Sequence, residues 1–388
     1  MDAVVFKGPY DIQVERRPKP SIQGTADAVV KVEVAGICGS ELHPYRGVQK
    51  TATGHVMGHE FVGVIEAVGS EVRELKAGQR VICIFSTAWY ASHILPWRFG
   101  QGQILIQKGS GSCWFCRYGF TNRCEKALAI GTQQSDGGQA EYVRVPDAEG
   151  TLVQVPLDVS PDLLVLMSDI FPTGYYAATR ALDLFHLSSG KRSDQSISPS
   201  LQFRPQPLSE AVFVCIGCGP VGLCAILTAV ARGVGTVFVV DSVDDRLNEA
   251  AKLGGIPLKL GIDDVHDRIL QATNGRGADA VIEAVGNSSA LQSAFEYLRP
   301  AGSISSIGFH HSPIPFTATQ AYQKNVSMSF GRAPVRAVFE DALALLRANQ
   351  DKLQSFITHR LPLSSAAQGY ELFDKQMARK VLLTVSSP

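Results

Sequence analysis

The stretch 211–222 constrains the fold of this 388-residue chain more than any other part of it. The apolar run 211–216 predicts a buried strand, and the apolar run 223–231 predicts a helix. Between them three glycines follow the pattern Gly-x-Gly-x-x-Gly. Glycines at this spacing allow a tight turn, a close approach of the backbone to a pyrophosphate, and close packing of the helix on the strand. A diphosphate would then sit against the unpaired N–H groups that begin the helix.

An acidic residue at the end of the next strand pattern supports this interpretation. The run 235–240 ends in Asp241, about 20 residues beyond the glycines. A carboxylate there accepts hydrogen bonds from a ribose 2′-OH and repels a 2′-phosphate, which predicts NAD rather than NADP. The alternative is a glycine-rich turn of another parallel-sheet protein, which the strand, helix and acid together disfavour. The predicted cofactor turn comprises Gly217, Gly219, Pro220, Val221 and Gly222.

Strand and helix patterns continue to alternate after Asp241. Helical patterns cover 246–253, 265–272 and 289–298, and strand patterns cover 256–260, 278–286 and 303–308. This alternation predicts a parallel sheet with right-handed crossovers. Ligands bind at the carboxyl ends of such strands, so further cofactor contacts are expected at Val285, Gly286, Ile307 and Gly308.

Composition excludes several classes of protein. Lys+Arg and Asp+Glu both number 36, so no nucleic acid or membrane surface is expected as a partner. The N-terminal residues show no signal-peptide pattern, and no apolar run reaches the ~18 residues of a membrane span. We therefore expect a cytoplasmic protein. Clustered cysteines in such a protein more often bind metal than form disulfides.

Two polar clusters separate the strand patterns 29–34, 61–68 and 80–85. The first reads Gly36-Ile-Cys38-Gly-Ser40-Glu41-Leu-His43 and the second reads Gly58-His59-Glu60. Together they resemble the motifs of the zinc-dependent medium-chain dehydrogenases, the alcohol dehydrogenase-like superfamily, although Glu41 stands where the family has Asp. Thiolate and imidazole are good zinc ligands, and a catalytic zinc site keeps one position open for substrate.

The resemblance implies roles for individual residues. Cys38 and His59 would hold the catalytic zinc, with Glu60 as a further ligand or as a carboxylate behind it. Ser40 and His43 would relay the released proton. Asp169, followed by Phe-Pro-Thr-Gly, resembles the formaldehyde-dehydrogenase-like branch and is preferred as a ligand over the alternative of a helix cap. Thr173 would lie near the nicotinamide, and Arg246 would lie on the adenine side unless it is simply solvated.

A second cysteine cluster resembles the structural-zinc lobe of the same family. In the lobe, residues 109–124, the spacing of Cys113, Cys116 and Cys124 matches the family, but Ser110 occupies the first ligand position. A closed structural site requires four ligands, and a hydroxyl is a poor one. The alternatives are three thiolates with water, a borrowed ligand, or no metal, and we favour a lobe built for zinc.

Two segments, 88–108 and 190–209, do not resemble the family. Aperiodic loops of about 20 residues are uncommon inside compact domains. They are either surface loops or translated introns in the gene model, and sequencing the transcript distinguishes the two.

The sequence thus predicts an α/β enzyme with a doubly wound parallel sheet (Rossmann) and a GroES-like β-barrel catalytic domain. The catalytic domain would cover 1–170 and be completed by 335–388, and the NAD-binding domain would cover 171–334. The expected function is zinc-dependent hydride transfer between an alcohol, or an aldehyde hydrate, and NAD, in a homo-oligomer such as a dimer or tetramer. The alternatives are a zinc-free NADPH-dependent enone or quinone reductase of the same superfamily, a non-catalytic dinucleotide-binding protein, and a poorly folding product disrupted by the two segments.

Overall fold

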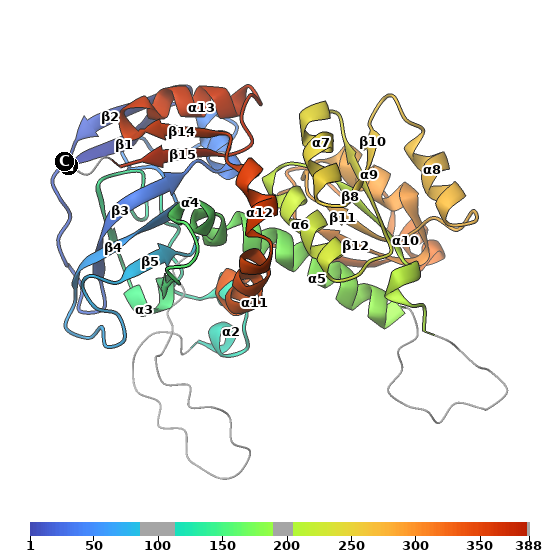
Figure 1. Cartoon of the computed structure of the whole chain (residues 1–388), viewed down its shortest axis with the longest axis horizontal. Coiled ribbons are helices and arrows are strands. Elements are labelled where there is room, and N and C mark those ends of the chain that lie inside the picture. The colour runs from blue at the N-terminus through green and yellow to red at the C-terminus, as the bar shows by residue number, and fades with distance from the viewer. Residues whose placement is uncertain (86–112, 189–204, 386–388) are drawn as a thin grey trace, which may run out of the picture. The chain divides into compact units, whose positions relative to one another are not determined.

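The structure, a computed structural model, describes residues 1–85, 113–188 and 205–385 (Figure 1). These form two compact units. Unit 1 comprises Met1–Asp169 and Pro334–Pro388, and unit 2 comprises Ile170–Ala333. The segment 88–108, Ser110 and residues 190–204 of the second atypical segment lie outside the described residues.

Unit 2 is built on a six-stranded parallel sheet, which confirms the parallel sheet predicted from the sequence. The strand order is β10-β9-β8-β11-β12-β13, so the order reverses between β8 and β11. Such a reversal opens a crevice at the carboxyl ends of the two strands, where ligands bind in doubly wound folds. The strands are β8 (Val212–Ile216), β9 (Thr236–Asp241), β10 (Ile256–Lys259), β11 (Ala278–Glu283), β12 (Leu298–Ser306) and β13 (Ser327–Phe330).

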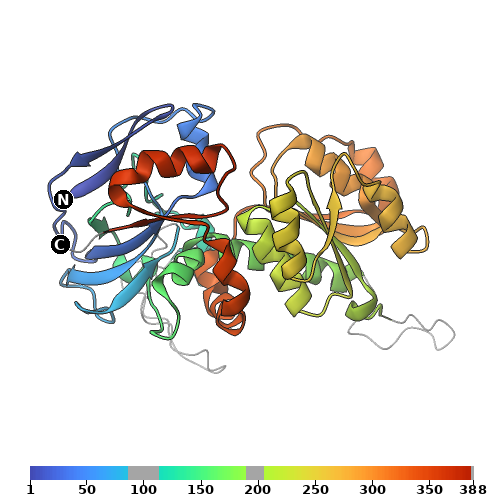
Figure 2. The same cartoon turned by 45° about the horizontal axis from the view of Figure 1, so that its top comes forward.

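Helices cover both faces of this sheet (Figures 1 and 2). Successive side chains of β8 point to opposite faces of the sheet, so both faces need a cover. Val212 and Val214 belong to one buried cluster with residues of α8 and α9. Phe213 points to the other face, where its ring lies 5.7 Å from that of Phe185 in α5. The helices are α5 (Ile170–Ser188), α6 (Pro220–Ala231), α7 (Asp244–Lys252), α8 (Val265–Ala272), α9 (Ser288–Tyr297) and α10 (Ala318–Lys324).

Unit 1 contains a seven-stranded sheet and a separate antiparallel hairpin of β1 (Asp2–Gly8) and β2 (Asp11–Arg16). The sheet order is β14-β15-β3-β4-β5-β7, and β6 also pairs with β3. Its central strands are rich in β-branched residues, and their side chains are buried on the core side. The strands are β3 (Ala28–Gly36), β4 (Glu60–Val68), β5 (Arg80–Cys83), β6 (Tyr142–Val145), β7 (Leu152–Gln154), β14 (His359–Pro362) and β15 (Val381–Thr384).

The C-terminal segment completes the sheet of unit 1. Strand β15 pairs antiparallel with β3, and Leu382 lies opposite Gly36. The helices of this segment are α11 (Val335–Ala348), α12 (Gln350–Leu353) and α13 (Ala366–Asp374). The earlier part of the unit contributes short helical turns: η1 (Gly39–Glu41), α1 (Leu42–Tyr45), α2 (Trp114–Arg117), η2 (Thr121–Arg123), α3 (Ala148–Thr151), α4 (Pro161–Leu164) and η3 (Val165–Ser168).

The sequence pattern over 356–360 also predicts a strand, but in the structure this strand begins later. Phe356 ends the 3₁₀ turn η5 (Gln354–Phe356) and is fully buried, and β14 starts only at His359. A single buried aromatic residue is compatible both with a strand and with a turn that packs on the core, so the sequence pattern does not distinguish them here. Within the described part of the chain, no helix is both long and apolar enough to cross a membrane.

Candidate functional site

The register of two neighbouring strands brings Cys38 and His59 together. Strands β3 and β4 pair antiparallel, with Gly36 opposite Glu60. Cys38 follows the end of β3, and His59 immediately precedes β4, so both residues lie at the same end of this strand pair. Both side chains are buried. The two polar clusters of the sequence therefore form one site although about 20 residues separate them.

Asp169 reaches the same place from a third element. It directly follows η3, a turn that is entirely buried in unit 1. Its Oδ2 atom lies 3.9 Å from Cys38 Sγ and 3.6 Å from His59 Nε2. One ligand atom each from Cys38, His59, Glu60 and Asp169 lies within 4.8 Å of all the others. The four predicted ligands of the catalytic zinc thus converge in the structure.

The chemistry of this donor set fits a zinc ion. His59 Nε2 and Glu60 Oε1 are buried and have no hydrogen-bond partner among the described residues. Leaving buried polar atoms unpaired costs about 1–3 kcal/mol each, unless a ligand satisfies them. The Zn–S and Zn–N bond lengths place tetrahedral donors roughly 3.3–3.8 Å apart, close to the separations found here. These residues could therefore hold zinc with little rearrangement.

Burial and neighbouring charges together raise the pKa of both Cys38 and His59. Burial raises the pKa of the Cys38 thiol, and the charge of Glu60 adds to that effect. Burial alone would lower the pKa of His59, but Cys38, Asp169 and Glu41 outweigh it and raise the pKa well above its ordinary value. Zinc requires the thiolate and the neutral imidazole, so metal binding would release protons here.

Glu60 is held by a residue that the sequence analysis did not identify. Its Oε2 atom accepts a hydrogen bond from Lys380, which is 1% exposed and also donates to the carbonyl of Ile37 at 3.0 Å. Gly36 is required beside this pair, because a Cβ atom there would lie 2.4 Å from Glu60 Oε2. Lys380 arrives here because it directly precedes β15, the strand that pairs with β3.

Glu41 lies behind His59 and was not among the predicted site residues. Its Oε1 atom is 3.3 Å from His59 Nδ1, at ion-pair distance rather than in hydrogen-bond alignment. Its Oε2 atom accepts from Cys38 N at 3.1 Å and from Gln139 Nε2 at 3.1 Å. The Tyr370 hydroxyl lies 3.1 Å from the same oxygen and 2.9 Å from Gln139 Oε1. Carboxylates in this position orient a metal-binding imidazole.

Ser40 and His43 lie on the short helical turns that follow Cys38. The Ser40 hydroxyl donates to Cys38 Sγ at 3.4 Å and is exposed, whereas His43 is half-buried in α1. His55 lies apart from the four ligands, and its Nδ1 atom is 3.0 Å from the carbonyl of Ala52. Ser40 therefore connects the candidate metal ligands with the protein surface.

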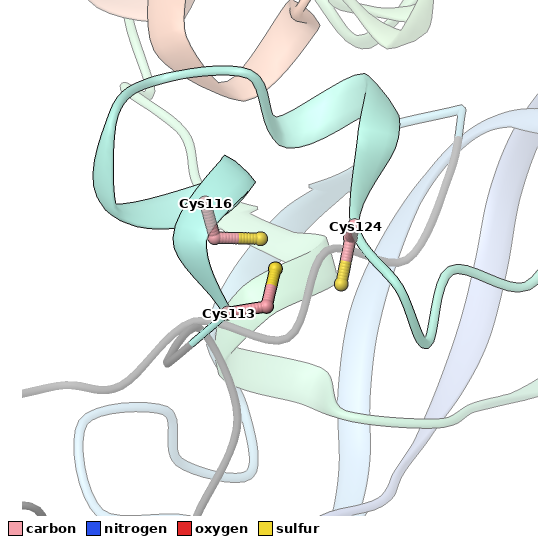
Figure 3. Close-up of side chains that lie close together, drawn as sticks. All are labelled: Cys113, Cys116 and Cys124. Carbon is pink, nitrogen blue, oxygen red and sulfur yellow. The ribbon is translucent and has the colours of Figure 1, made fainter.

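The three cysteines of the predicted zinc lobe also come together (Figure 3). Cys113 directly precedes the single turn of α2, Cys116 lies within that turn, and Cys124 follows η2. Their sulfur atoms lie within 4.8 Å of one another. Three thiols in this arrangement match three corners of a tetrahedral zinc site, and Ser110, the predicted fourth position, lies outside the described residues.

The structure requires glycine at two of the three glycines of the cofactor turn in unit 2, and the third leaves open space. Gly217 has a φ of +93°. A Cβ atom at Gly222 would lie 1.8 Å from the Gly217 carbonyl, whereas one at Gly219 would meet nothing within 4 Å. Gly219 precedes α6, which begins with Pro220. The turn is therefore tight at its two ends and open at the middle glycine, where a diphosphate could approach.

Asp241, at the end of β9, is oriented by the backbone around this turn. Its Oδ2 atom accepts from Cys218 N at 2.8 Å, and its Oδ1 atom accepts from Val243 N at 3.0 Å. Arg246 lies 3.7 Å from Oδ2. The carboxylate is thereby fixed beside the glycine turn.

The remaining predicted cofactor residues lie in unit 2 as well. Val285 and Gly286 follow β11, and Ile307 and Gly308 follow β12, so both pairs end neighbouring parallel strands. The two loops touch, because a Cβ atom at Gly308 would lie 2.2 Å from Gly286 N. Thr173 lies in α5 and is half-buried.

Known proteins share both halves of this arrangement. Residues 24–157 match the family model described as "Alcohol dehydrogenase GroES-like domain", and residues 220–348 match "Zinc-binding dehydrogenase". The chain is 42% identical over 98% of its length to "Zinc-type alcohol dehydrogenase B" of Aspergillus flavus, covering 81% of that protein. It is 42% identical over 83% of its length to "Medium chain reductase/dehydrogenase ucsI" of Acremonium sp, covering 98% of it.

A solved structure agrees with the sequence matches. "Alcohol dehydrogenase TADH from Thermus sp. ATN1" superposes with a TM-score of 0.84 at 33% identity, covering 100% of both chains. A GroES-like unit and a parallel nucleotide-fold unit together define a medium-chain oxidoreductase. The chain belongs to the zinc-type alcohol dehydrogenase family within that class. The matches do not single out the formaldehyde-dehydrogenase-like branch.

Proposed function

We propose that this chain catalyses zinc-dependent hydride transfer between an alcohol, or an aldehyde hydrate, and NAD. The observation that carries the proposal is the convergence of Cys38, His59, Glu60 and Asp169, with two buried donor atoms that lack a hydrogen-bond partner in the described residues. Membership of the zinc-type alcohol dehydrogenase family supports zinc. Family membership alone does not establish NAD as the cofactor or the class of substrate, and both belong to this proposal.

The residues of unit 1 would hold the metal and move a proton. Cys38, His59 and Asp169 would bind zinc, and Glu60 would offer Oε1 while Lys380 retains Oε2. Zinc bound there would supply Lewis-acid polarisation of the substrate oxygen. Ser40 would accept the proton of the substrate hydroxyl and His43 would pass it to solvent, the relay expected from the sequence.

The residues of unit 2 would bind the dinucleotide, which accepts the hydride. The turn around Gly219 would cradle the diphosphate, and Asp241 would accept hydrogen bonds from the adenosine ribose. Arg246, Thr173 and the two loops after β11 and β12 would complete the site. We further propose a structural zinc at Cys113, Cys116 and Cys124, and self-association as a dimer or tetramer in the cytoplasm.

A substrate screen tests the function. Protein purified without added zinc is assayed for metal content and then against a panel of alcohols and aldehydes, with NADH absorbance as the readout. We expect bound zinc and turnover with NAD on at least one alcohol. Bound NADH without turnover across the panel would instead support a non-catalytic dinucleotide-binding protein, and metal-free protein that reduces enones with NADPH would support the zinc-free reductase.

Replacing Asp241 with Ser is expected to lower the preference for NAD over NADP by about 100-fold. The substitution removes a negative charge that would repel a 2′-phosphate, an interaction worth several kcal/mol at about 4 Å and an effective dielectric near 20. The ratio of kcat/KM for the two cofactors measures the effect. Asp244→Asn, which changes an exposed carboxylate three residues further on, is the control and should leave the ratio unchanged.

Replacing Tyr370 with Phe is expected to weaken zinc binding about tenfold. The phenol contacts Glu41, the carboxylate behind His59, and loss of such outer partners typically costs 10–100-fold in metal affinity. Competition with a chromogenic chelator measures the dissociation constant. Tyr45→Phe is the matched control, since the Tyr45 ring lies 5.5 Å from that of Tyr370. Equal zinc affinity in Tyr370→Phe and the unmodified protein would contradict a positioning role for the phenol.

A further inference from the structure

A buried hydrogen-bond network in unit 2 has no role in the function described so far. Glu283 ends β11 and is fully buried. Its Oε1 atom accepts from Val285 N at 2.8 Å and Gly286 N at 2.7 Å. Its Oε2 atom accepts from Ser306 Oγ at 2.7 Å and lies 3.0 Å from His310 Nε2. One side chain thus connects the loops that follow β11 and β12.

The positions of the protons in this network follow from the number of hydrogen-bond donors that its contacts require. Ser306 Oγ donates to Glu283 and also lies 2.8 Å from His310 Nε2. Because the hydroxyl proton is already used, only an N–H at Nε2 can satisfy both contacts of the imidazole. Glu283 then receives four donors on its two oxygens, which is the pattern of an ionised carboxylate. With a neutral imidazole at His310, the network therefore carries one negative charge, on Glu283.

No arginine or lysine among the described residues forms an ion pair with Glu283; its one such contact is with His310. Hydrogen-bond donors alone therefore stabilise this charge, next to the two loops. Both loops are in backbone contact, and Ile307 N also donates to the Glu283 carbonyl at 2.9 Å. A buried charge acts over several ångströms because little water lies between it and its surroundings.

The position of the network indicates which half of a dinucleotide it would face. A doubly wound sheet binds one mononucleotide with each half, on either side of the strand-order reversal. Asp241, the proposed ribose partner of the adenosine, ends β9 in the first half. Glu283 ends β11, Ser306 ends β12, and His310 lies in the loop after β12, all in the second half. That half would receive the nicotinamide.

We propose that the Glu283 carboxylate, positioned by Ser306 and His310, makes this site prefer the oxidised dinucleotide. The proposal rests on the proposed function, namely dinucleotide binding by unit 2. The nicotinamide ring is positively charged when oxidised and neutral when reduced, so a fixed negative charge nearby stabilises the oxidised form selectively. His310 is a positioning residue, because it acts on the cofactor through the carboxylate that it holds.

The test compares the dissociation constants of NAD and NADH at pH 8, measured by titration calorimetry on the full chain. Glu283→Gln keeps the shape of the side chain and removes the charge, and the network can adapt because the Ser306 hydroxyl can rotate and His310 can change tautomer. We expect the ratio Kd(NADH)/Kd(NAD) to fall about tenfold. Asp279→Asn is the control, since it removes a buried carboxylate from the other end of β11, where Asp279 pairs with Arg299.

A second pair of variants keeps the test decisive if Glu283→Gln fails to fold. His310→Lys places a permanent positive charge beside Glu283 and should lower the ratio, whereas His310→Gln keeps a donor without a charge and should preserve it. A ratio that stays unchanged in folded Glu283→Gln and in His310→Lys overturns the proposal, as does an equal fall in Asp279→Asn. If the unmodified protein binds neither NAD nor NADH, the proposed function itself fails.

Discussion

Replacing Cys38 with Ser is expected to reduce turnover by at least about a thousandfold. The thiolate is the only sulfur donor in the cluster of four proposed zinc ligands. A neutral hydroxyl binds zinc weakly, and loss of Lewis-acid catalysis removes several kcal/mol of transition-state stabilisation. Steady-state assays on the best alcohol of the panel, with zinc content measured on the same sample, give the result.

The same variant is expected to bind NADH with unchanged affinity. All the residues proposed to contact the cofactor, including Thr173 in α5 and the loops after β11 and β12, belong to unit 2, whereas Cys38 belongs to unit 1. NADH fluorescence titration separates the loss of metal from a loss of cofactor binding.

Cys83→Ser provides a matched control for the Cys38 variant. Cys83 is also fully buried and lies at the end of β5 in the same sheet, but it is not a member of the metal cluster. It should keep its zinc and its turnover. Full activity in Cys38→Ser would show that the proposed zinc mechanism is wrong.

Much of the fold follows from local patterns in the sequence. Helix α8 forms over 265–272, the residues that its pattern predicts, and the alternation after Asp241 gives the parallel sheet. The four proposed zinc ligands also converge as the resemblance to zinc-dependent dehydrogenases implied. The motif spacing could predict this convergence because Cys38 and His59 each lie next to the strand that positions them, β3 and β4.

The residues that surround the metal ligands could not be found in this way. Lys380 reaches Glu60 across 320 positions of sequence, and Tyr370 reaches Glu41 across 329. Neither belongs to a motif, and both are placed by the pairing of β15 with β3 and by the packing of α13. Glu41 gave a signal that could have been used, because this acid directly follows Cys38-Gly-Ser40 and lies where a partner for His59 is needed.

His310 illustrates the same limit in unit 2. The sequence singled out the strand ends at Val285 and Ile307 but not the imidazole three residues further on. A histidine in a loop is commonly exposed, so its contacts with Ser306 and Glu283 depend on how that loop folds back. Motif spacing predicts the residues that bind a shared ligand. It does not predict the residues that position those side chains.

Replacing Lys380 with Met is expected to destabilise metal-free unit 1 by about 3–5 kcal/mol. Lys380 is the cation that pairs with Glu60, and both side chains are at most 1% exposed. Methionine leaves the buried carboxylate without its counter-charge, and it also removes the donor to the Ile37 carbonyl. The loss of stability is this large because one partner of a buried ion pair is removed while the other charge stays buried.

Denaturant unfolding in the presence of a chelator measures this loss. Tryptophan fluorescence is the readout, and Trp114 is the tryptophan of unit 1 that the structure describes. Lys76→Met, which removes an exposed lysine of the same unit, controls for the loss of a positive charge and should change stability little.

A double variant distinguishes an uncompensated charge from simple loss of packing. Glu60→Gln combined with Lys380→Met removes both charges, so most of the stability lost in Lys380→Met should return. Lost packing would instead make the double variant at least as unstable as the single one, because neither substitution restores the contacts of the lysine chain. Recovery would therefore show that Lys380 stabilises unit 1 chiefly by neutralising Glu60, and that this carboxylate is charged before any metal binds.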